Sequence, residues 1–297
     1  MDENGPITSP ESRFPQQSMD TAIEGDDNAL LPLFPVHEAV VSGDLNYVKE
    51  MLYLGGDVND LHFGGITPLH MACLAGHHEI AVYLIENGAL IDSFSVERST
   101  PLCEAAAGGH PRLVTLLLSL GARVNPPLLL ATPLHEAALR GNMNGCYEVI
   151  EVLLQHGADV VCNDSHHGSP LHAACSKRNP NTSAIKLLLE AGSNPNGLQF
   201  HITPLHLIAK NSQCTSSAML LIFYGANVHL RDNQNRRPID LVPSARHPLH
   251  SLLHACVQEP RSLLLLSRLA VRNCIGKEKL REIQTLNLPV GLRNVLK

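Results

Sequence analysis

Apolar residues in the middle of the chain recur at helical spacing in short segments, and these segments come in pairs. In one example, Ile80, Tyr83 and Leu84 precede a Gly-Ala turn. The other segment of each pair begins with Thr or Ser followed by Pro. This is typical of a helix start, because the hydroxyl caps the first turn and the N–H that Pro lacks would have no partner within the helix at this position. Gly76 and Gly109 are typical helix ends. The pattern predicts an all-α chain of short helix pairs.

The helix starts repeat at an interval of about 33 residues. They are Thr67-Pro68-Leu69-His70, Thr100-Pro101-Leu102-Cys103, Thr132-Pro133-Leu134-His135, Ser169-Pro170-Leu171-His172 and Thr203-Pro204-Leu205-His206. Related sequences stand one interval before them, at 34–37, and one interval after them, at 237–240. A second mark, a glycine-led turn such as Gly121-Ala122, follows each start. Such a repeat predicts stacked units that bury their apolar faces on one another.

The Thr-Pro-Leu-His start and the glycine-led turn, which both recur about every 33 residues, resemble the ankyrin repeat. The resemblance implies a solenoid of helix-turn-helix units with β-hairpin tips, six full repeats at about 33–236 and a truncated closing repeat at 237–257. It also implies that the histidine rings bond the backbone of neighbouring repeats. Two repeats are longer, with extra residues around 142–146 and 178–182. These insertions are either partner-specific features or tolerated lengthening of exposed loops.

The predicted hairpin tips carry the candidate target-binding residues. These are Phe63, Phe94, Arg98, Leu128, Leu129 and Phe200. Aromatic residues are only 4% of the chain, so three phenylalanines at tips are conspicuous, and exposed apolar side chains often mark interfaces. The alternative is that these side chains pack between neighbouring tips.

After the repeats, residues 262–275 predict a helix that is apolar nearly all round, and fewer than 25 residues follow to cover it. The segment resembles the elongin C-binding box of a SOCS box, with Ser267 at the usual cysteine position. The resemblance implies contacts with elongin C from Leu263, Leu266, Ser267, Ala270 and Val271. Residues 288–292 resemble the box that selects cullin-5, with Gly291 in place of the second proline. This implies cullin contacts from Leu288, Pro289, Val290 and Leu292.

Ankyrin repeats followed by a SOCS box at 258–297 resemble the ankyrin-repeat-and-SOCS-box family, in particular its shorter members with six or seven repeats. The resemblance implies a non-catalytic substrate-recognition subunit of a ubiquitin ligase, with elongin C, elongin B, cullin-5 and a RING-box protein as partners and an unidentified protein as target. The repeats would bind that target and promote its ubiquitination and proteasomal degradation. The alternative is a plain ankyrin scaffold whose last helices only cap the stack.

Composition and charge limit the kinds of partner and the cellular location that we expect for the protein. The net charge of −6 and pI of about 6.3 argue against a nucleic-acid partner. There is no apolar run of membrane-spanning length and no signal-peptide pattern, so we expect no membrane partner and a cytoplasmic or nuclear location. Residues 1–32 are acidic and rich in Ser, Pro and Gln, which predicts a disordered tail.

A search for catalytic and metal-binding motifs leaves one group of residues. His247, His250 and His254 stand at helical spacing with Cys256 nearby, which is a possible metal site or simply a polar helix face. Pro248 would place His247 just before the helix. We expect the polar face, and therefore no metal, no cofactor and no enzymatic activity. The eight cysteines contain no Cys-x-x-Cys pair, and we expect free thiols.

Overall fold

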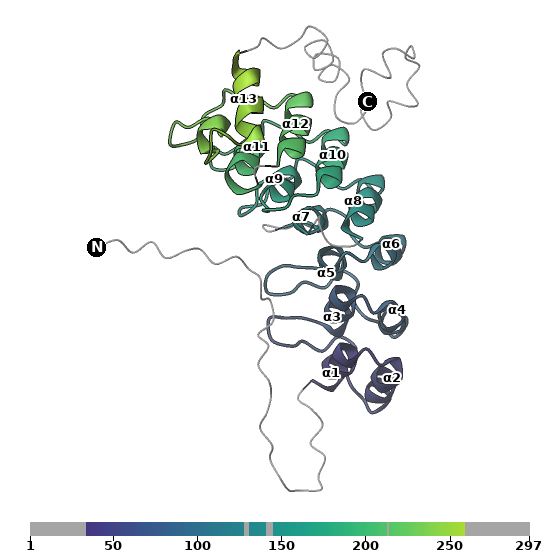
Figure 1. The fold of residues 1–297 in the computed structure, drawn as a ribbon. Helices are drawn as coiled ribbons and strands as arrows, with labels where there is room; N and C mark the ends of the chain where they lie inside the picture. Colours follow the sequence, from purple (N-terminus) through teal and green to yellow (C-terminus); the bar gives the residue numbers. More distant parts are fainter. Residues whose placement is uncertain (1–33, 128–130, 141–144, 213, 259–297) are drawn as a thin grey trace, which may run out of the picture. The chain divides into compact units, whose positions relative to one another are not determined.

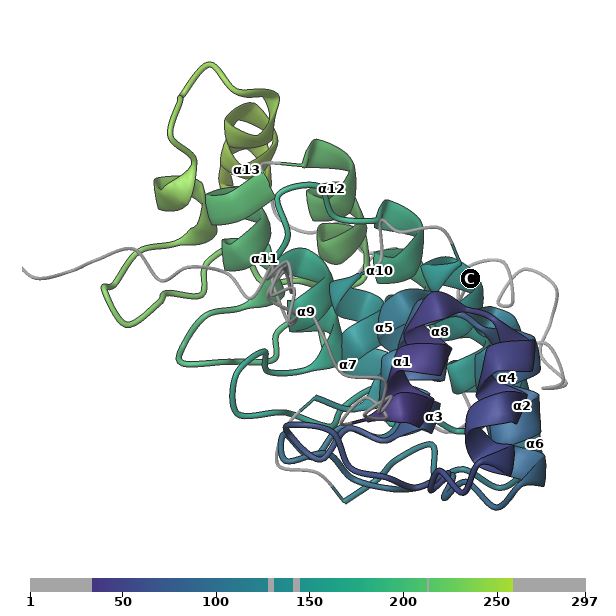
Figure 2. The same ribbon diagram turned by 90° about the horizontal axis from the view of Figure 1, so that it is seen from below.

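The computed structural model describes residues 34–127, 131–140, 145–212 and 214–258. Within these ranges the chain forms a row of inner helices and a row of outer helices, with the tips of the repeats projecting to one side (Figures 1 and 2). The inner helices are α1 (Pro35–Ser42), α3 (Pro68–Ala75), α5 (Pro101–Gly108), α7 (Pro133–Leu139), α9 (Pro170–Cys175) and α11 (Pro204–Leu207). The outer helices are α2 (Leu45–Tyr53), α4 (His78–Glu86), α6 (Pro111–Ser119), α8 (Cys146–Gln155), α10 (Thr182–Glu190) and α12 (Thr215–Phe223).

The inner helices begin and end where the sequence predicts. Thr67 precedes Pro68 in extended conformation and its hydroxyl accepts a hydrogen bond from the His70 N–H, so it is the N-cap of α3. Gly76 ends the same helix with φ of 83°, a conformation that favours glycine, and its N–H donates to Ala72. A cap of this kind contributes about 1 kcal/mol to helix stability.

The core lies between the two rows of helices. The leucine of each Thr-Pro-Leu-His start is fully buried, and so are apolar residues on the facing side of each outer helix, such as Leu84, Leu117 and Leu188. Each inner helix packs on the next inner helix and on its own outer helix. Because full burial of one leucine contributes about 2 kcal/mol, this repeated contact is the main source of stability for the stack.

The tips between repeats are tight turns closed by single β-bridges. His62 pairs with Ile66, Asp164 with Gly168, and Gln199 with Ile202, and no longer strand occurs in the described residues. The predicted hairpins are therefore present only as minimal turns. The extra residues of repeat five fall in the loop between α9 and α10, as predicted for an insertion, whereas most of the repeat-four insertion lies outside the described residues.

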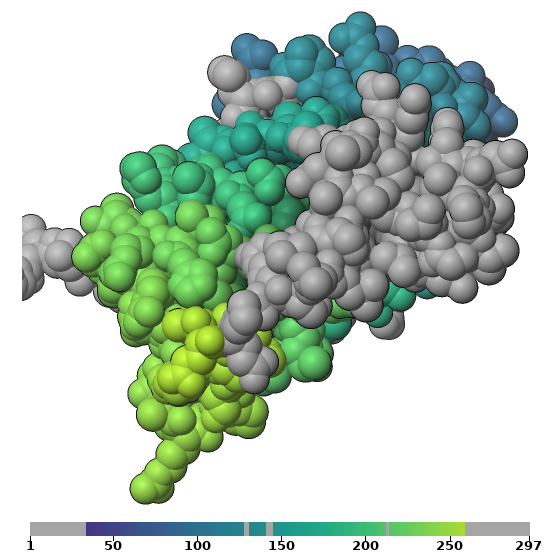
Figure 3. All heavy atoms as spheres, turned by 90° about the horizontal axis from the view of Figure 1, so that it is seen from above, coloured from purple at the N-terminus to yellow at the C-terminus, as the bar shows by residue number. Residues whose placement is uncertain are grey.

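The last two repeats depart from the regular pattern. After α11 the chain continues as a π-helical turn, η1 (Ile208–Ser212), where no glycine ends the inner helix. The closing repeat consists of a short 3₁₀ helix, η2 (Pro238–Leu241), and α13 (Pro248–Gln258). Figure 3 shows the described surface passing from this closing repeat, in yellow-green, to earlier repeats in teal. None of the helices in the described part of the chain is long and apolar enough to cross a membrane.

Candidate protein-binding surface

Buried histidines join every inner helix except α5, which has Cys103 at that position, to the tip of the next repeat, and this bonding holds the binding surface in shape. In α3, the His70 Nδ1 accepts hydrogen bonds from the Thr67 N–H at 3.2 Å and the Thr67 hydroxyl at 2.8 Å. Since Nδ1 is an acceptor, the proton lies on Nε2, which donates to the Ser99 carbonyl of the next repeat at 3.1 Å. One neutral ring therefore links a helix cap to the following tip.

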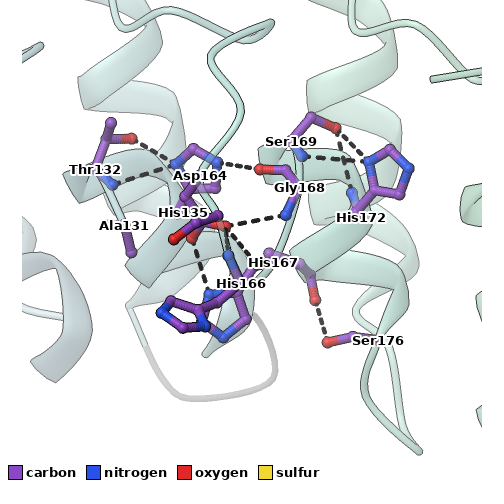
Figure 4. Close-up of polar contacts among 12 residues, drawn as sticks. Ala131, Thr132, His135, Asp164, His166, His167, Gly168, Ser169, His172 and Ser176 are labelled. Carbon is purple, nitrogen blue, oxygen red and sulfur yellow. Dashed lines mark hydrogen bonds and ion pairs between the residues drawn. The ribbon is translucent and has the colours of Figure 1, made fainter. Parts of the chain in front are cut away.

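The same arrangement recurs along the stack. Figure 4 shows the His135 ring between the Thr132 cap and the Gly168 carbonyl, which it reaches at 2.8 Å. His172 and His206 donate in the same way to Gly197 and Arg236. The sequence-based expectation that these rings bond neighbouring repeats is confirmed. We call the set of His70, His135, His172 and His206 the histidine ladder.

Burial keeps the histidine ladder neutral. The cost of charging a buried ring lowers the pKa of His70 to about 4, although the hydrogen bond to Ser99 opposes this effect. Burial also lowers the pKa of His135, His172 and His206. Protonation would place a hydrogen on Nδ1, where the threonine N–H already donates, so the neutral form is the one that fits the fold.

Two tips are held by a buried aspartate that the sequence analysis did not single out. The Asp164 carboxylate accepts hydrogen bonds from the N–H groups of His166, His167 and Gly168 and from the His167 ring (Figure 4). Burial alone would raise the pKa of Asp164, but the hydrogen bonds from His167 lower it, and the bond to Asp164 raises the pKa of His167.

Asp232 acts in the same way at the last tip, where it accepts from the N–H groups of Gln234 and Arg236 and from the Arg236 guanidinium at 2.8 Å. Both aspartates stand five positions before a helix cap, a shared register that could have identified them from the sequence. The carboxylates add hydrogen bonds to the single backbone pairing of each tip, from Asp164 N–H to Gly168 and from Asp232 N–H to Arg236.

Four of the six predicted target-binding residues lie in the described part of the chain, at the tips, and all four are exposed. The exposed fraction is 74% for Phe63, 70% for Phe200 and 43% for Phe94, and Arg98 is also exposed. These side chains are therefore not buried between neighbouring tips. Leu128 and Leu129 lie outside the described residues.

Phe63 belongs to an aromatic cluster at the first tip. Its ring lies 5.6 Å from that of Phe34 and 5.0 Å from that of His62, and Phe34 also contacts His62 at 4.5 Å. The rings meet edge to face, which is a favourable arrangement for aromatic pairs. The cluster fixes the position of an exposed phenylalanine, and a preorganised aromatic side chain loses little conformational entropy when it binds a partner.

Comparison with known families accounts for both parts of the chain. The family model described as "Ankyrin repeats (3 copies)" matches residues 36–128 and 134–232, and the model described as "SOCS box" matches residues 259–297. The chain belongs to the ankyrin repeat and SOCS box family. The resemblance deduced from the repeat marks and the C-terminal segment is thereby confirmed.

Relatives in this family share about a third of their residues with the chain. Ankyrin repeat and SOCS box protein 9 of Mus musculus is 36% identical over 172 residues, which are 58% of this chain and 56% of that protein. Ankyrin repeat and SOCS box protein 5 of Oryctolagus cuniculus is 35% identical over 167 residues, which are 56% of this chain and 48% of that protein. The matched part spans about half the length of these relatives.

A solved structure supports the fold. The crystal structure of the human ASB11 ankyrin repeat domain has a TM-score of 0.69 and 32% sequence identity, and the match covers 77% of this chain and 99% of that one. The predicted ankyrin-repeat solenoid is confirmed.

The remaining predicted sites of this family member divide into two groups. The nine residues predicted to contact elongin C or a cullin, from Leu263 to Leu292, lie outside the described residues. Pro248 begins α13 and His247 precedes that helix, as predicted, while the His250 and His254 rings stack at 6.3 Å. Within the described ranges, no group of three or more His, Cys, Asp or Glu is arranged to hold a metal ion.

Proposed function

We propose that this protein is a substrate-recognition subunit of an elongin B/C–cullin-RING ubiquitin ligase. The observation that carries the proposal is the SOCS-box match at 259–297, directly after an ankyrin stack whose last described helix ends at Gln258. The repeats bind the target and the SOCS box binds the ligase. The protein itself catalyses nothing, and it promotes ubiquitination and degradation by raising the concentration of target lysines near the ubiquitin-conjugating enzyme.

The first half of the SOCS box carries the proposed elongin C contacts. Leu263, Ser267 and Val271 stand at helical spacing on one face, with Leu266 and Ala270 beside them. A serine in an apolar contact brings a hydroxyl that requires a hydrogen bond, and the carbonyl four residues earlier, on Leu263, is the nearest acceptor in a helix. Elongin B joins through elongin C.

The second half carries the proposed cullin contacts, Leu288, Pro289, Val290 and Leu292, and we assign cullin-5 with its RING-box protein as the partner. The prediction is that Pro289→Ala weakens cullin-5 capture about tenfold and leaves elongin binding unchanged, because a proline in an extended segment lowers the ordering cost of docking. Pull-down of cullin-5 by the purified ternary complex measures this. Unchanged capture would contradict the assignment of the cullin box.

The repeats offer the target a surface of tips and inner helices. Support comes from Phe63, Phe94, Arg98 and Phe200, which are exposed there although aromatic residues are scarce in the chain. We place Leu128 and Leu129 in the same surface on sequence grounds. A cytoplasmic or nuclear location, without a nucleic-acid or membrane partner, belongs to the same proposal.

Co-expression of the full chain with elongin B and elongin C tests the proposal directly. We expect a stoichiometric complex on size-exclusion chromatography, and we expect Leu263→Asp to abolish it, because a carboxylate cannot be buried without a partner. The matched control is Leu54→Asp, which changes an exposed leucine of the first repeat and is expected to leave the complex intact.

A folded chain that elutes alone would contradict the proposal and favour the ankyrin scaffold with a helical cap. Loss of folding in Leu263→Asp, seen by circular dichroism, would also favour the cap, since a residue of a separate docking helix is not needed for the stack to fold.

A further inference from the structure

Charge is distributed unevenly along the ankyrin stack. Residues 34–131 contain ten acidic and four basic residues, whereas residues 132–258 contain eight acidic and nine basic ones. The first three repeats are therefore strongly negative, and the later repeats carry a small positive charge. A long target that binds along the stack meets opposite charges at its two ends.

The basic residues of the later repeats include a row at the ends of the inner helices. Arg140 is the C-cap of α7, Lys177 and Arg178 follow the end of α9, and Lys210 lies in η1 after α11. These helices pack on one another in order. The ends themselves are joined, because the Asn211 side chain donates to the Ser176 carbonyl at 2.9 Å. We call Arg140, Lys177, Arg178 and Lys210 the basic row.

The basic row has no acidic partner within the described part of the chain. Among the described residues, no ion pair involves these four side chains, of which Lys177, Arg178 and Lys210 are exposed. Three aspartates of the later repeats have partners of their own. Asp164 pairs with His167, Asp232 with Arg236, and Asp240 with Arg237. The positive charge of the row is thus available to a partner.

Helix stability does not explain the basic row. A cation at an exposed helix C-terminus stabilises the helix only slightly. The equivalent positions in the second and third repeats are Ala75 and Gly108, and those helices form without a charge. Arg178 also stands beyond the C-cap of α9, which is Ser176.

The geometry defines which ligand the row fits. Packed helices lie about 10 Å apart, so Arg140, Lys177 and Lys210 span about 20 Å over three repeats. A peptide in the extended polyproline II conformation rises about 3.1 Å per residue with three residues per turn, so every third side chain lies on one face and meets the next repeat. The tip at Phe200 lies just before α11 and Lys210 lies just after it, and the chain from Thr203 to Lys210 rises about 10 Å, so the row and this tip flank one short inner helix.

We propose that the basic row is the docking site for an acidic segment of the target, in extended conformation, with carboxylates about three residues apart and an apolar side chain directed at the tip of Phe200. The inference rests on the proposed function, because the segment belongs to the protein that the ligase recognises. Since the whole chain carries a net charge of −6, general electrostatics would repel such a segment, and binding requires a local basic surface.

Fluorescence anisotropy with the full chain in complex with elongin B and C tests the inference. The probe is a fluorescein-labelled twelve-residue peptide with glutamate at every third position and one phenylalanine, and the reference peptide has glutamine in place of glutamate. We expect the glutamate peptide to bind at least tenfold more tightly. We expect Lys177→Glu with Lys210→Glu to reduce its affinity at least tenfold.

The control variant, Lys49→Glu with Arg112→Glu, makes the same change of net charge on exposed residues of the outer helices α2 and α6, and we expect less than a twofold effect. Equal loss in both variants, or equal binding of the two peptides, would overturn the inference. Tighter binding of a single-stranded oligonucleotide of equal length would overturn it as well. Failure of the ligase proposal is separate, since it appears as loss of elongin co-elution in the unchanged chain.

Discussion

The second repeat and the first repeat contain the same histidine in different surroundings. In the second repeat, Thr67 supplies two donors to Nδ1 of His70, and Nε2 donates to Ser99. In the first repeat, Nε2 of His37 makes the equivalent bond to Ile66 at 2.8 Å, but Phe34 stands where the threonine would be, and the buried Nδ1 has no partner. The first repeat keeps the contact with its neighbour and lacks the cap.

This difference shows that a complete set of histidine bonds requires a hydroxyl residue at the helix cap. Phe34 cannot cap α1, and its ring instead contacts His62 and Phe63 in the exposed aromatic cluster. The first repeat thus gains a fixed aromatic tip and loses one hydrogen-bonding partner for a buried nitrogen. An unpaired buried polar atom costs about 1–3 kcal/mol. We expect the interior repeats to be the more stable part of the stack, and three measurements examine this comparison.

The largest effect is expected from acid. The pKa of His70 in the folded chain, about 4, lies below its value of 6.5 in the unfolded chain, so the unfolded chain binds the proton first. The stabilisation is complete above pH 6.5 and is lost as the pH falls towards 4, by an amount on the order of 3 kcal/mol for His70 alone. Urea unfolding at pH 7.5 and pH 5, followed by circular dichroism, measures about 2 kcal/mol of this loss, because pH 5 lies about 1.5 units below the pKa of the unfolded chain.

His70→Gln removes one titrating group and should make the loss between pH 7.5 and 5 smaller. His156→Gln, at an exposed ring, is the control and should leave the loss unchanged. Identical pH dependence in all three proteins would show that the histidine ladder does not control the acid response.

A somewhat smaller effect is expected when a ring of the histidine ladder is removed. His135→Leu leaves the Thr132 N–H without a partner and the Gly168 carbonyl with only the bond from the Asp164 N–H, and we expect a loss of about 2 kcal/mol in unfolding free energy. His37→Leu removes one bond together with an unpaired nitrogen, so we expect a loss of about 1 kcal/mol. Urea unfolding at pH 7.5 compares the two. Equal losses of unfolding free energy in His135→Leu and His37→Leu would mean that the bonds to the helix cap do not contribute to stability.

The smallest effect isolates the hydroxyl group. Thr67→Val keeps the shape of the side chain and removes the cap of α3 and one partner of His70, which should cost about 1.5 kcal/mol. Thr115→Val, on the exposed side of α6, should change the unfolding free energy by less than about 0.5 kcal/mol. Thermal unfolding of both variants measures this. If Thr115→Val destabilised the protein more than Thr67→Val, the Thr67 hydroxyl would be excluded as the source of the difference between the two repeats.

The regular parts of the fold were predictable because they depend on local chemistry that recurs in the sequence. The Thr-Pro helix starts, the glycine stops at Gly76 and Gly109 and the insertion in repeat five all appear where expected. The histidine contacts were expected only through the resemblance to ankyrin repeats. Spacing alone does not show which carbonyl a ring will meet in the next repeat.

The irregular parts depend on contacts between residues that no pattern links. In the π-helical turn at 208–212, the Asn211 side chain bonds to Ser176 of the previous repeat. No sequence pattern near Asn211 predicts this bond. The unpaired nitrogen of His37 follows from Phe34, which the sequence did display at the cap position. Asp164 and Asp232 were missed because polar residues in a turn are common and only their shared register distinguishes them.

The candidate binding surface was predictable in position but not in chemistry. Phe63, Phe94, Arg98 and Phe200 are exposed at tips because the repeat register places them there. The basic row was not anticipated, because its members stand at helix ends in three different repeats and become neighbours only through stacking. Which target these surfaces select is not contained in the repeat pattern, which constrains the buried positions and leaves the exposed ones free.

The histidine ladder has a direction, and this bears on how such a chain can gain or lose repeats during evolution. Each ring donates to the repeat that follows it, so deletion of a repeat from the C-terminal end removes the carbonyl acceptor of the ring before it. Deletion from the N-terminal end would only expose a carbonyl to water, which satisfies it at little cost. In the closing repeat, Asp240 takes the place of the histidine and bonds back to Arg237, so no ring points onward. The histidine ladder therefore ends at His206, whose ring donates to Arg236 in the closing repeat.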